Sequence, residues 1–152
     1  MQATFKIWET NRKLHLAFLE NYTLKQLNKI PEGFKNNLIW NIGHIITTQQ
    51  GLIYRLSGLP VNISKEFHNK YKYGSVPTQT TTKKEVDEIK ELLISLIKQT
   101  QDDYASGKFV AFTPYETHIG FHLATFEEAI NFNNYHEGIH LGFMMNLSLI
   151  HI

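Results

Sequence analysis

The chain has 152 residues, of which 42% are hydrophobic and 19% are charged. This length and composition are typical of one globular domain, here expected over residues 1–152, and exclude an intrinsically disordered protein. The net charge of +1 gives no support for nucleic acid as a partner, and the absence of cysteine excludes disulfides, iron–sulfur clusters and thiolate zinc sites.

Two helices are predicted in the first part of the chain. Apolar residues recur at helical spacing over residues 4–27, and Pro31 ends that pattern. A second helix is predicted from about residue 35 to residue 57, because an apolar seam continues up to Gly58. Residues 59–81 show no helical rhythm and are predicted to form a long loop.

Two more helices begin at capping boxes. Thr82 and Glu85 are spaced so that each side chain can bond the other residue's backbone amide, and an apolar pattern follows to near Tyr104. The same spacing at Thr125 opens a helix that runs almost to the C-terminus. Residues 105–124 between them do not read as helix. The predicted fold class is all-α, a four-helix bundle with two long crossover loops.

The last predicted helix carries the most informative pattern in the chain. His136 and His140 are four residues apart, so they lie on one helical face, about 6 Å from each other. An imidazole on an apolar face needs a partner for its ring nitrogens, and a divalent metal is a good one. The apolar residues expected on that face are Phe132, Ile139, Phe143, Leu147 and Ile150.

The segment from His136 to His140 also matches the H-E-x-x-H pattern of zinc peptidases. Those enzymes need a third ligand downstream, yet no Asp or Glu follows Glu137, and the metzincin position holds Asn146. Glu137 also projects about 80° from the midpoint of the histidine pair. We therefore do not expect a peptidase.

A third metal ligand must come from upstream, and His44 on the second predicted helix is the natural candidate. It follows Gly43, which allows a close approach of another backbone or a metal. Its side of the helix, shared with Trp40 and Thr48, either faces a cleft or forms a polar flank, and periodicity does not decide between these. Three neutral imidazoles with an open fourth position would lower the pKa of a bound water or thiol.

The remaining histidines are expected to lie outside the site. His15, His68 and His151 are interpreted as core or surface residues satisfied by hydrogen bonds. His118 and His122 are also four residues apart, but a glycine lies between them in a non-helical stretch. Spacing alone does not decide between a metal site and hydrogen-bonded histidines for the other three.

The run Trp40-Asn-Ile-Gly-His44 on one helix, followed by Asn133-Asn-Tyr-His-Glu-Gly-Ile-His-Leu-Gly142 on another, resembles the DinB/YfiT-like superfamily. The resemblance spans nearly the whole chain. It implies a four-helix bundle with down-up-up-down topology and a divalent metal, such as nickel or zinc, held by three histidines. Carried over to this sequence, these ligands are His44, His136 and His140.

Characterised members that the chain resembles are thiol-dependent transferases and isomerases, which suggests a metal-dependent enzyme that transfers a low-molecular-weight thiol to an electrophile. The metal would bind the thiol as thiolate. Because the chain has no cysteine, the thiol must arrive as a small-molecule substrate. Arg12 and His15, one turn apart on the first helix, either hold an anionic substrate group or form a solvated helix edge. No catalytic residue is identified, and the reacting group would be a thiol or water bound to the metal.

Two other functions stay open. The chain could be a non-catalytic metal-binding or stress-response bundle, or a hydrolase that uses the same three histidines. A fourth protein ligand from His118, His122 or Glu137 would favour a closed, structural metal site.

No targeting or membrane segment is expected. Lys6, Glu9, Arg12 and Lys13 interrupt the start of the chain, where a signal peptide needs an unbroken apolar run. No stretch reaches the apolar length that spans a membrane. We therefore expect a cytoplasmic protein without a membrane partner.

The helices carry more apolar residues than one core can bury, because an apolar stripe covers little more than a third of a helix surface. The excess residues are Ile7, Leu14 and Phe18 on the first helix and Leu141 and Met145 on the last. Either the long loops cover them or a second copy does, and we expect a homodimer built on these helix faces.

Overall fold

The computed structural model describes residues 1–149, and the elements in that range are mostly helical. In chain order they are α1 (Gln2–Asn21), α2 (Leu24–Asn28), α3 (Leu38–Gln49), the π-helix η1 (Gln50–Arg55), α4 (Lys65–Tyr71), α5 (Lys83–Ala105), β1 (Tyr115–Glu116), β2 (His122–Leu123) and α6 (Phe126–Leu149). The expectations for Ile150 and His151 lie outside the described residues.

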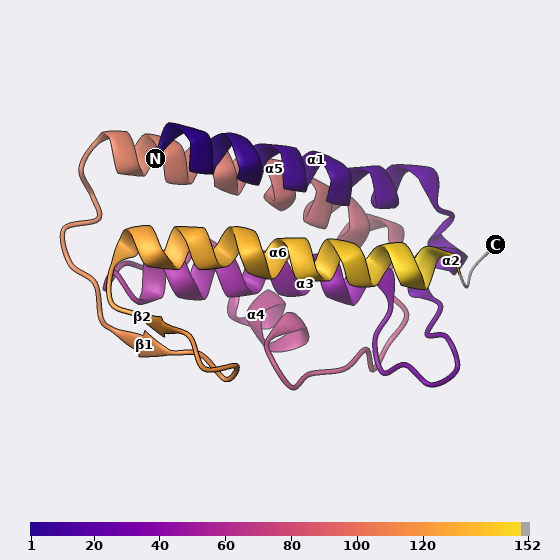
Figure 1. Cartoon of the computed structure of the whole chain (residues 1–152). Helices are drawn as coiled ribbons and strands as arrows, with labels where there is room; N and C mark the ends of the chain where they lie inside the picture. The colour runs from indigo at the N-terminus through magenta and orange to yellow at the C-terminus, as the bar shows by residue number, and fades with distance from the viewer. Residues whose placement is uncertain (150–152) are drawn as a thin grey trace.

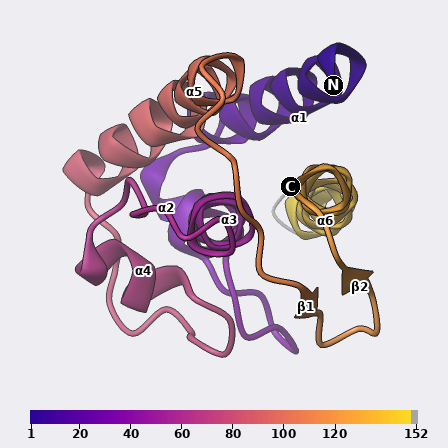
Figure 2. The same cartoon turned by 90° about the vertical axis from the view of Figure 1, so that its left-hand side faces the viewer.

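Four long helices form the all-α bundle that the sequence predicts. Helix α1 contacts α5 and α6, and α3 contacts the same two helices. In Figure 1, α1 and α6 run from left to right while α3 and α5 run in the opposite direction, so the order along the chain is down, up, up, down. Because α3 and α5 are parallel, the segment between them, which includes α4, crosses from one end of the bundle to the other (Figures 1 and 2).

The prediction for the first helix is wrong at its C-terminal end, because the segment divides into two helices. Helix α1 ends at Asn21, and both Tyr22 and Thr23 adopt extended backbone conformations. Thr23 then caps α2, since its hydroxyl accepts from the Gln26 amide while the Gln26 side chain accepts from the Thr23 amide. The apolar pattern continues across this point, but the capping box begins a new helix, so α1 does not extend into α2.

A second correction concerns residues 59–81, which were predicted to form a loop without helix. Helix α4 lies within this segment, and Ser64 caps it by accepting from the backbone amide of Phe67 at 3.0 Å. Phe67 and Tyr71 are buried in the main apolar cluster. Tertiary packing of these two side chains, rather than periodicity, stabilises such a short helix.

The second predicted helix begins slightly later than expected, at Leu38, because the Asn37 side chain caps it by accepting from the Trp40 amide at 2.8 Å. Its last part, from Gln50 to Arg55, is π-helical. Such segments are frequent at functional sites, where they change the direction of side chains relative to the rest of the helix.

Both capping boxes predicted for the last two long helices are confirmed. The Thr82 hydroxyl accepts from the Glu85 amide at 3.3 Å, and the Glu85 carboxylate accepts from the Thr82 amide at 2.7 Å. At α6, the Glu128 amide donates to the Thr125 hydroxyl and the Thr125 amide donates to the Glu128 carboxylate, both at 3.2 Å. Between the two helices the chain folds back in a short antiparallel pair, β1 and β2.

The core has two apolar clusters with polar residues between them. One cluster includes Leu19, Leu93 and Leu147, and the other includes Trp8 and Ile130. The buried residues that lie between the clusters along α1 and α6 are polar, and they include Arg12, His15, Asn133 and Glu137. None of the helices within residues 1–149 has the length and apolar character needed to cross a membrane.

Candidate metal centre

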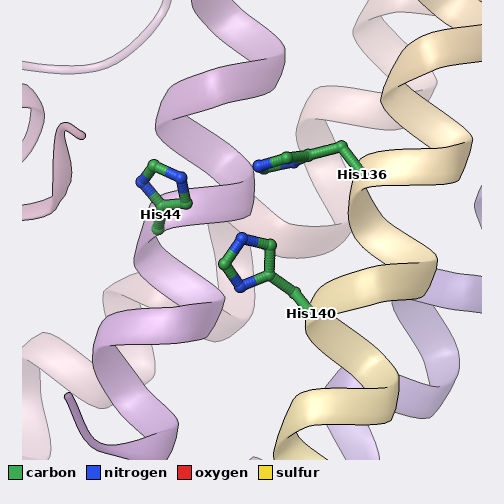
Figure 3. A group of neighbouring side chains, drawn as sticks. All are labelled: His44, His136 and His140. Atoms are coloured by element: carbon green, nitrogen blue, oxygen red, sulfur yellow. The ribbon is translucent and has the colours of Figure 1, made fainter. Parts of the chain in front are cut away.

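Three imidazoles from two helices converge within the bundle (Figure 3). His44 comes from α3, and His136 and His140 come from successive turns of α6. Their ring centroids are 5.3 Å apart for His44 and His136, 5.0 Å for His44 and His140, and 4.6 Å for the α6 pair. One nitrogen from each ring lies within 4.8 Å of the other two. The structure thus brings together the three residues that the sequence predicted as metal ligands, here called the triad.

Hydrogen bonds from outside the triad orient two of its rings. His44 Nδ1 lies 2.8 Å from the backbone carbonyl of Tyr71, which can only accept, so Nδ1 carries the proton. His140 Nδ1 lies 2.8 Å from Asn41 Oδ1, and the Asn41 amide nitrogen donates to the Asn37 carbonyl at 2.8 Å, which directs the oxygen toward His140. In both rings the lone pair is therefore on Nε2, as in histidines that bind metals.

All three imidazoles are held in the neutral form. Burial lowers the pKa of His136 to about 3, and the neighbouring His44, Arg12 and His15 lower it too. Burial also lowers the pKa of His44, and burial followed by the nearby His136 lowers the pKa of His140. Because only a neutral imidazole offers a lone pair, the three side chains are ready to coordinate a metal near neutral pH.

The arrangement fits a divalent metal with an open coordination position. Three nitrogens at about 2.1 Å from a tetrahedral ion would lie roughly 3.4 Å apart, so side-chain movements of about 1 Å complete the geometry. His136 is the ring that can turn most easily, because its buried Nδ1 makes no hydrogen bond within residues 1–149. Over the same residues, the cluster that could hold a metal contains no carboxylate and no fourth histidine.

The side chains considered as a fourth ligand have other partners. Glu137 belongs to a buried ion pair described below, and His122 Nδ1 lies 2.7 Å from the Glu116 carboxylate. His118 stacks on Tyr73 with 4.6 Å between the ring centroids. Neither of these two histidines joins the triad, as expected from the non-helical segment that carries them. This geometry favours an open site over a closed structural one.

Gly43 does permit a close approach, but its neighbour is neither a backbone segment nor a metal. A Cβ atom at this position would lie 2.5 Å from the ring of Tyr71. The carbonyl of Tyr71 holds His44, and Trp40 stacks on the same imidazole with 4.7 Å between centroids and an interplanar angle of 8°. Within the pattern from Trp40 to His44, Trp40 thus packs on the candidate ligand, and Gly43 leaves room for the Tyr71 residue that orients it.

Glu137 points away from the triad, as its helical angle predicted. It is fully buried, and its carboxylate accepts from the Arg12 guanidinium at 2.8 Å, from Trp8 Nε1 at 2.8 Å and from Asn133 Nδ2 at 2.9 Å. A carboxylate held by these donors cannot act as the general base that the H-E-x-x-H mechanism needs beside the metal. The geometry supports the rejection of a peptidase.

Arg12 and His15 lie in the core, which corrects the prediction of a solvated helix edge and agrees with the interpretation of His15 as a core residue. Neither side chain is exposed, so they do not form a solvated helix edge. The positive charge of the Arg12 guanidinium is compensated by the Glu137 carboxylate, and the guanidinium also donates to the Leu93 carbonyl at 3.3 Å. Its charge is therefore neutralised inside the protein. His15 Nδ1 donates to the Asn11 carbonyl at 2.7 Å. Neither residue lines the cavity beside the triad, and their placement does not support contact with a substrate.

A cavity of about 430 Å³ lies beside the triad, among residues of α3, η1, the segment after α4 and the β-hairpin. His136 lies on its wall together with Thr48 and Phe132. His68 and His118 also line it, although the sequence placed neither of them near the site. This volume is within the range of pockets that bind small molecules.

The face of α6 around the histidines is less apolar than predicted. Phe132, Phe143 and Leu147 pack in the core clusters, but 47% of Ile139 is exposed. The buried arc of α6 is centred near Asn133 and Met144, and Ile139 lies about 120° around the helix from Asn133. The assignment of Ile139 to the buried face was therefore wrong.

Comparison with known families agrees with the resemblance seen in the sequence. A family model described as the DinB superfamily matches residues 7–144, a range that contains the whole triad. A comparison with curated proteins found no match. Because the family match covers most of the 152 residues, this chain belongs to the DinB superfamily.

Proposed function

We propose that the triad of His44, His136 and His140 binds one divalent metal ion and that the protein is a metal-dependent enzyme. The observation that carries this proposal is the convergence of three neutral imidazoles, one of which, His136, lies on the wall of a cavity of ligand size. In two of the rings, Nδ1 donates to the Tyr71 carbonyl or to Asn41 Oδ1, which leaves the lone pair on Nε2. Imidazole ligands suit nickel and zinc, and an open fourth position leaves room for a substrate.

The reaction we propose is transfer of a low-molecular-weight thiol to a small electrophile. When bound, the metal lowers the pKa of a coordinated thiol and so supplies thiolate at neutral pH. The chain has no cysteine, so the sulfur nucleophile is a substrate. Thr48 lines the cavity, and its hydroxyl lies 3.3 Å from His44 Nε2. From this position the hydroxyl can form a hydrogen bond with the substrate and orient it.

A thiol-transfer assay tests the enzyme. Protein purified without a His-tag and loaded with nickel or zinc is mixed with glutathione or cysteine and chlorodinitrobenzene. Attack of the sulfur on the ring carbon forms a thioether and releases chloride. We expect a rate above the uncatalysed reaction that is lost with chelator and in His44→Ala, and retained in His122→Ala. Equal rates for wild type and His44→Ala would contradict the proposal.

We also propose a homodimer that forms through faces of α1 and α6. The long loops do not cover the excess apolar residues there, since Ile7 is 54% exposed, Leu14 43% and Met145 51%. Phe18 and Leu141 are only half-buried, and Phe18 stacks on Tyr22. A second copy would remove these side chains from water, and closed two-fold dimers are the commonest way to do so.

A further inference from the structure

The cavity beside the triad has a positively charged wall. Arg55 ends the π-helix η1 and Lys72 follows α4, and both line the cavity together with His68. Within the described part of the chain, the lining contains no Asp or Glu. Over residues 1–149, neither Arg55 nor Lys72 takes part in an ion pair. The cavity therefore presents two cationic groups whose charge the protein does not compensate.

The three basic side chains are close enough to influence one another. Burial lowers the pKa of His68, and the positive charges of Arg55 and Lys72 lower it further. His68 is therefore neutral near pH 7 and contributes a hydrogen-bonding imidazole rather than a third charge. Repulsion between like charges on one wall is relieved when an anionic group lies between them.

Much of the rest of the wall is apolar or aromatic, with three threonines among these residues. Leu52 and Phe132 line it from η1 and α6. Tyr73 from the segment after α4 stacks on His118 from the hairpin, with 4.6 Å between ring centroids and an interplanar angle of 23°. His136 lies on the same wall. One molecule of moderate size can thus contact both the basic side chains and a member of the triad.

We propose that this cavity binds an organic anion whose carboxylate, sulfonate or phosphate group lies at Arg55, His68 and Lys72 and whose apolar body extends toward His136. This inference names the substrate class of the proposed enzyme and so rests on the proposed function. The basic side chains bind one end of the molecule, and the apolar wall binds its body beside the metal centre. Because the substrate is already positioned when it binds, less entropy is lost in the reaction step.

A matched pair of fluorescent probes tests the anion site without any metal. Anilinonaphthalene sulfonate carries one sulfonate on an aromatic body, and N-phenylnaphthylamine has the same body without the charge. Chelator-treated protein is titrated with each probe. We expect Arg55→Gln and Lys72→Gln each to weaken sulfonate binding about threefold, and the double variant roughly tenfold, while binding of the neutral probe stays unchanged. Added salt should also weaken only the sulfonate.

Two controls separate this inference from the proposed function. Lys84→Gln removes an exposed lysine of α5 that does not line the cavity, so it should leave both probes unaffected. His44 does not line the cavity either, so His44→Ala should lose the metal but keep the charge-dependent probe binding.

The outcomes are distinct. Sulfonate affinity that is unchanged in the Arg55→Gln/Lys72→Gln variant, or an equal loss for both probes, overturns the anion site whatever the metal content. Charge-dependent binding by a protein that takes up no nickel or zinc when these ions are added back supports the anion site and overturns only the proposed enzyme.

Discussion

The Arg12 guanidinium on α1 and the Glu137 carboxylate on α6 lie 2.8 Å apart, and neither side chain is exposed to solvent. Glu137 directly follows His136, so this ion pair ties the helix that carries two of the three candidate ligands to α1. Hydrogen bonds from Trp8 and Asn133 satisfy the carboxylate further. The pair therefore fixes the position of α6 relative to α1.

Replacing Glu137 by Gln should lower the free energy of unfolding by about 3 to 5 kcal/mol, because the buried charge of Arg12 then lacks its counter-charge. Urea denaturation measures this loss. The Arg12→Met/Glu137→Leu variant removes both charges and should lose less than the single variant. The folded fraction of Glu137→Gln should keep its metal, and no peptidase activity is expected from either form. A Glu137→Gln protein as stable as wild type would show that the pair contributes little.

Replacing any member of the triad by Ala should remove most of the bound metal, because two imidazoles hold a divalent ion far more weakly than three. Elemental analysis of untagged protein gives the metal content, and metal–nitrogen distances of about 2.0–2.2 Å are expected in the loaded protein. His122→Ala is the matched control, since His122 is exposed, lies outside the triad and contacts the Glu116 carboxylate through Nδ1. Full occupancy in His44→Ala would rule out the three-histidine site.

Asn41 should tune the metal affinity although it does not touch the metal. Its Oδ1 holds the His140 ring in the tautomer that frees Nε2. Loss of such a partner typically weakens metal binding by about 10- to 100-fold. We expect Asn41→Ala to bind at least tenfold more weakly in a chelator competition, while Asn41→Asp, which keeps the acceptor, binds nearly as tightly as wild type. Equal affinities for wild type and Asn41→Ala would contradict this role.

The stability of the metal-free protein should fall in mild acid. Burial lowers the pKa of His15 to about 4, from the ordinary value of 6.5 that the unfolded chain keeps. Between these values the unfolded state binds more protons than the folded state, so the free energy of unfolding falls as the pH falls through 6.5 toward 4. For His15 alone, this amounts to roughly 2 kcal/mol between pH 7 and pH 5.

His15→Gln isolates that contribution, because the other histidines titrate alike in both proteins. Urea denaturation at pH 7 and pH 5 should show a smaller acid-induced loss in the variant. Parallel losses in the two proteins would mean that His15 is not buried in its neutral form.

Light scattering should give a mass near twice the 17.7 kDa of one chain. Lysines in place of Ile7 and Met145 would bring uncompensated charge into the proposed interface and should shift the protein to the monomer mass. Val110→Lys is the control, since Val110 is 90% exposed and lies in the segment between α5 and β1. A wild-type mass of one chain at micromolar concentration would exclude the dimer.

Much of the fold could be predicted because its signals are local. The capping boxes at Thr82 and Thr125 act within one turn of helix, so the sequence contains both partners of each hydrogen bond. Helix α4 could not be predicted in this way, because its stability depends on burying Phe67 and Tyr71 against distant helices. The site follows the same division. The i, i+4 spacing of His136 and His140 is local, whereas the support of His140 by Asn41 spans 99 residues.

The sequence by itself determined the four long helices, the residue types they carry, and that three histidines are candidate ligands. Only the tertiary structure decided which charged residues are buried and which partners they have. Arg12 was expected at a surface or a substrate, and it lies in the core because Glu137, 125 residues away, compensates it there. Arg55 and Lys72 showed no pattern, yet they share a cavity wall. Burial and partners set the energy of a charge, and these depend on which helices pack together.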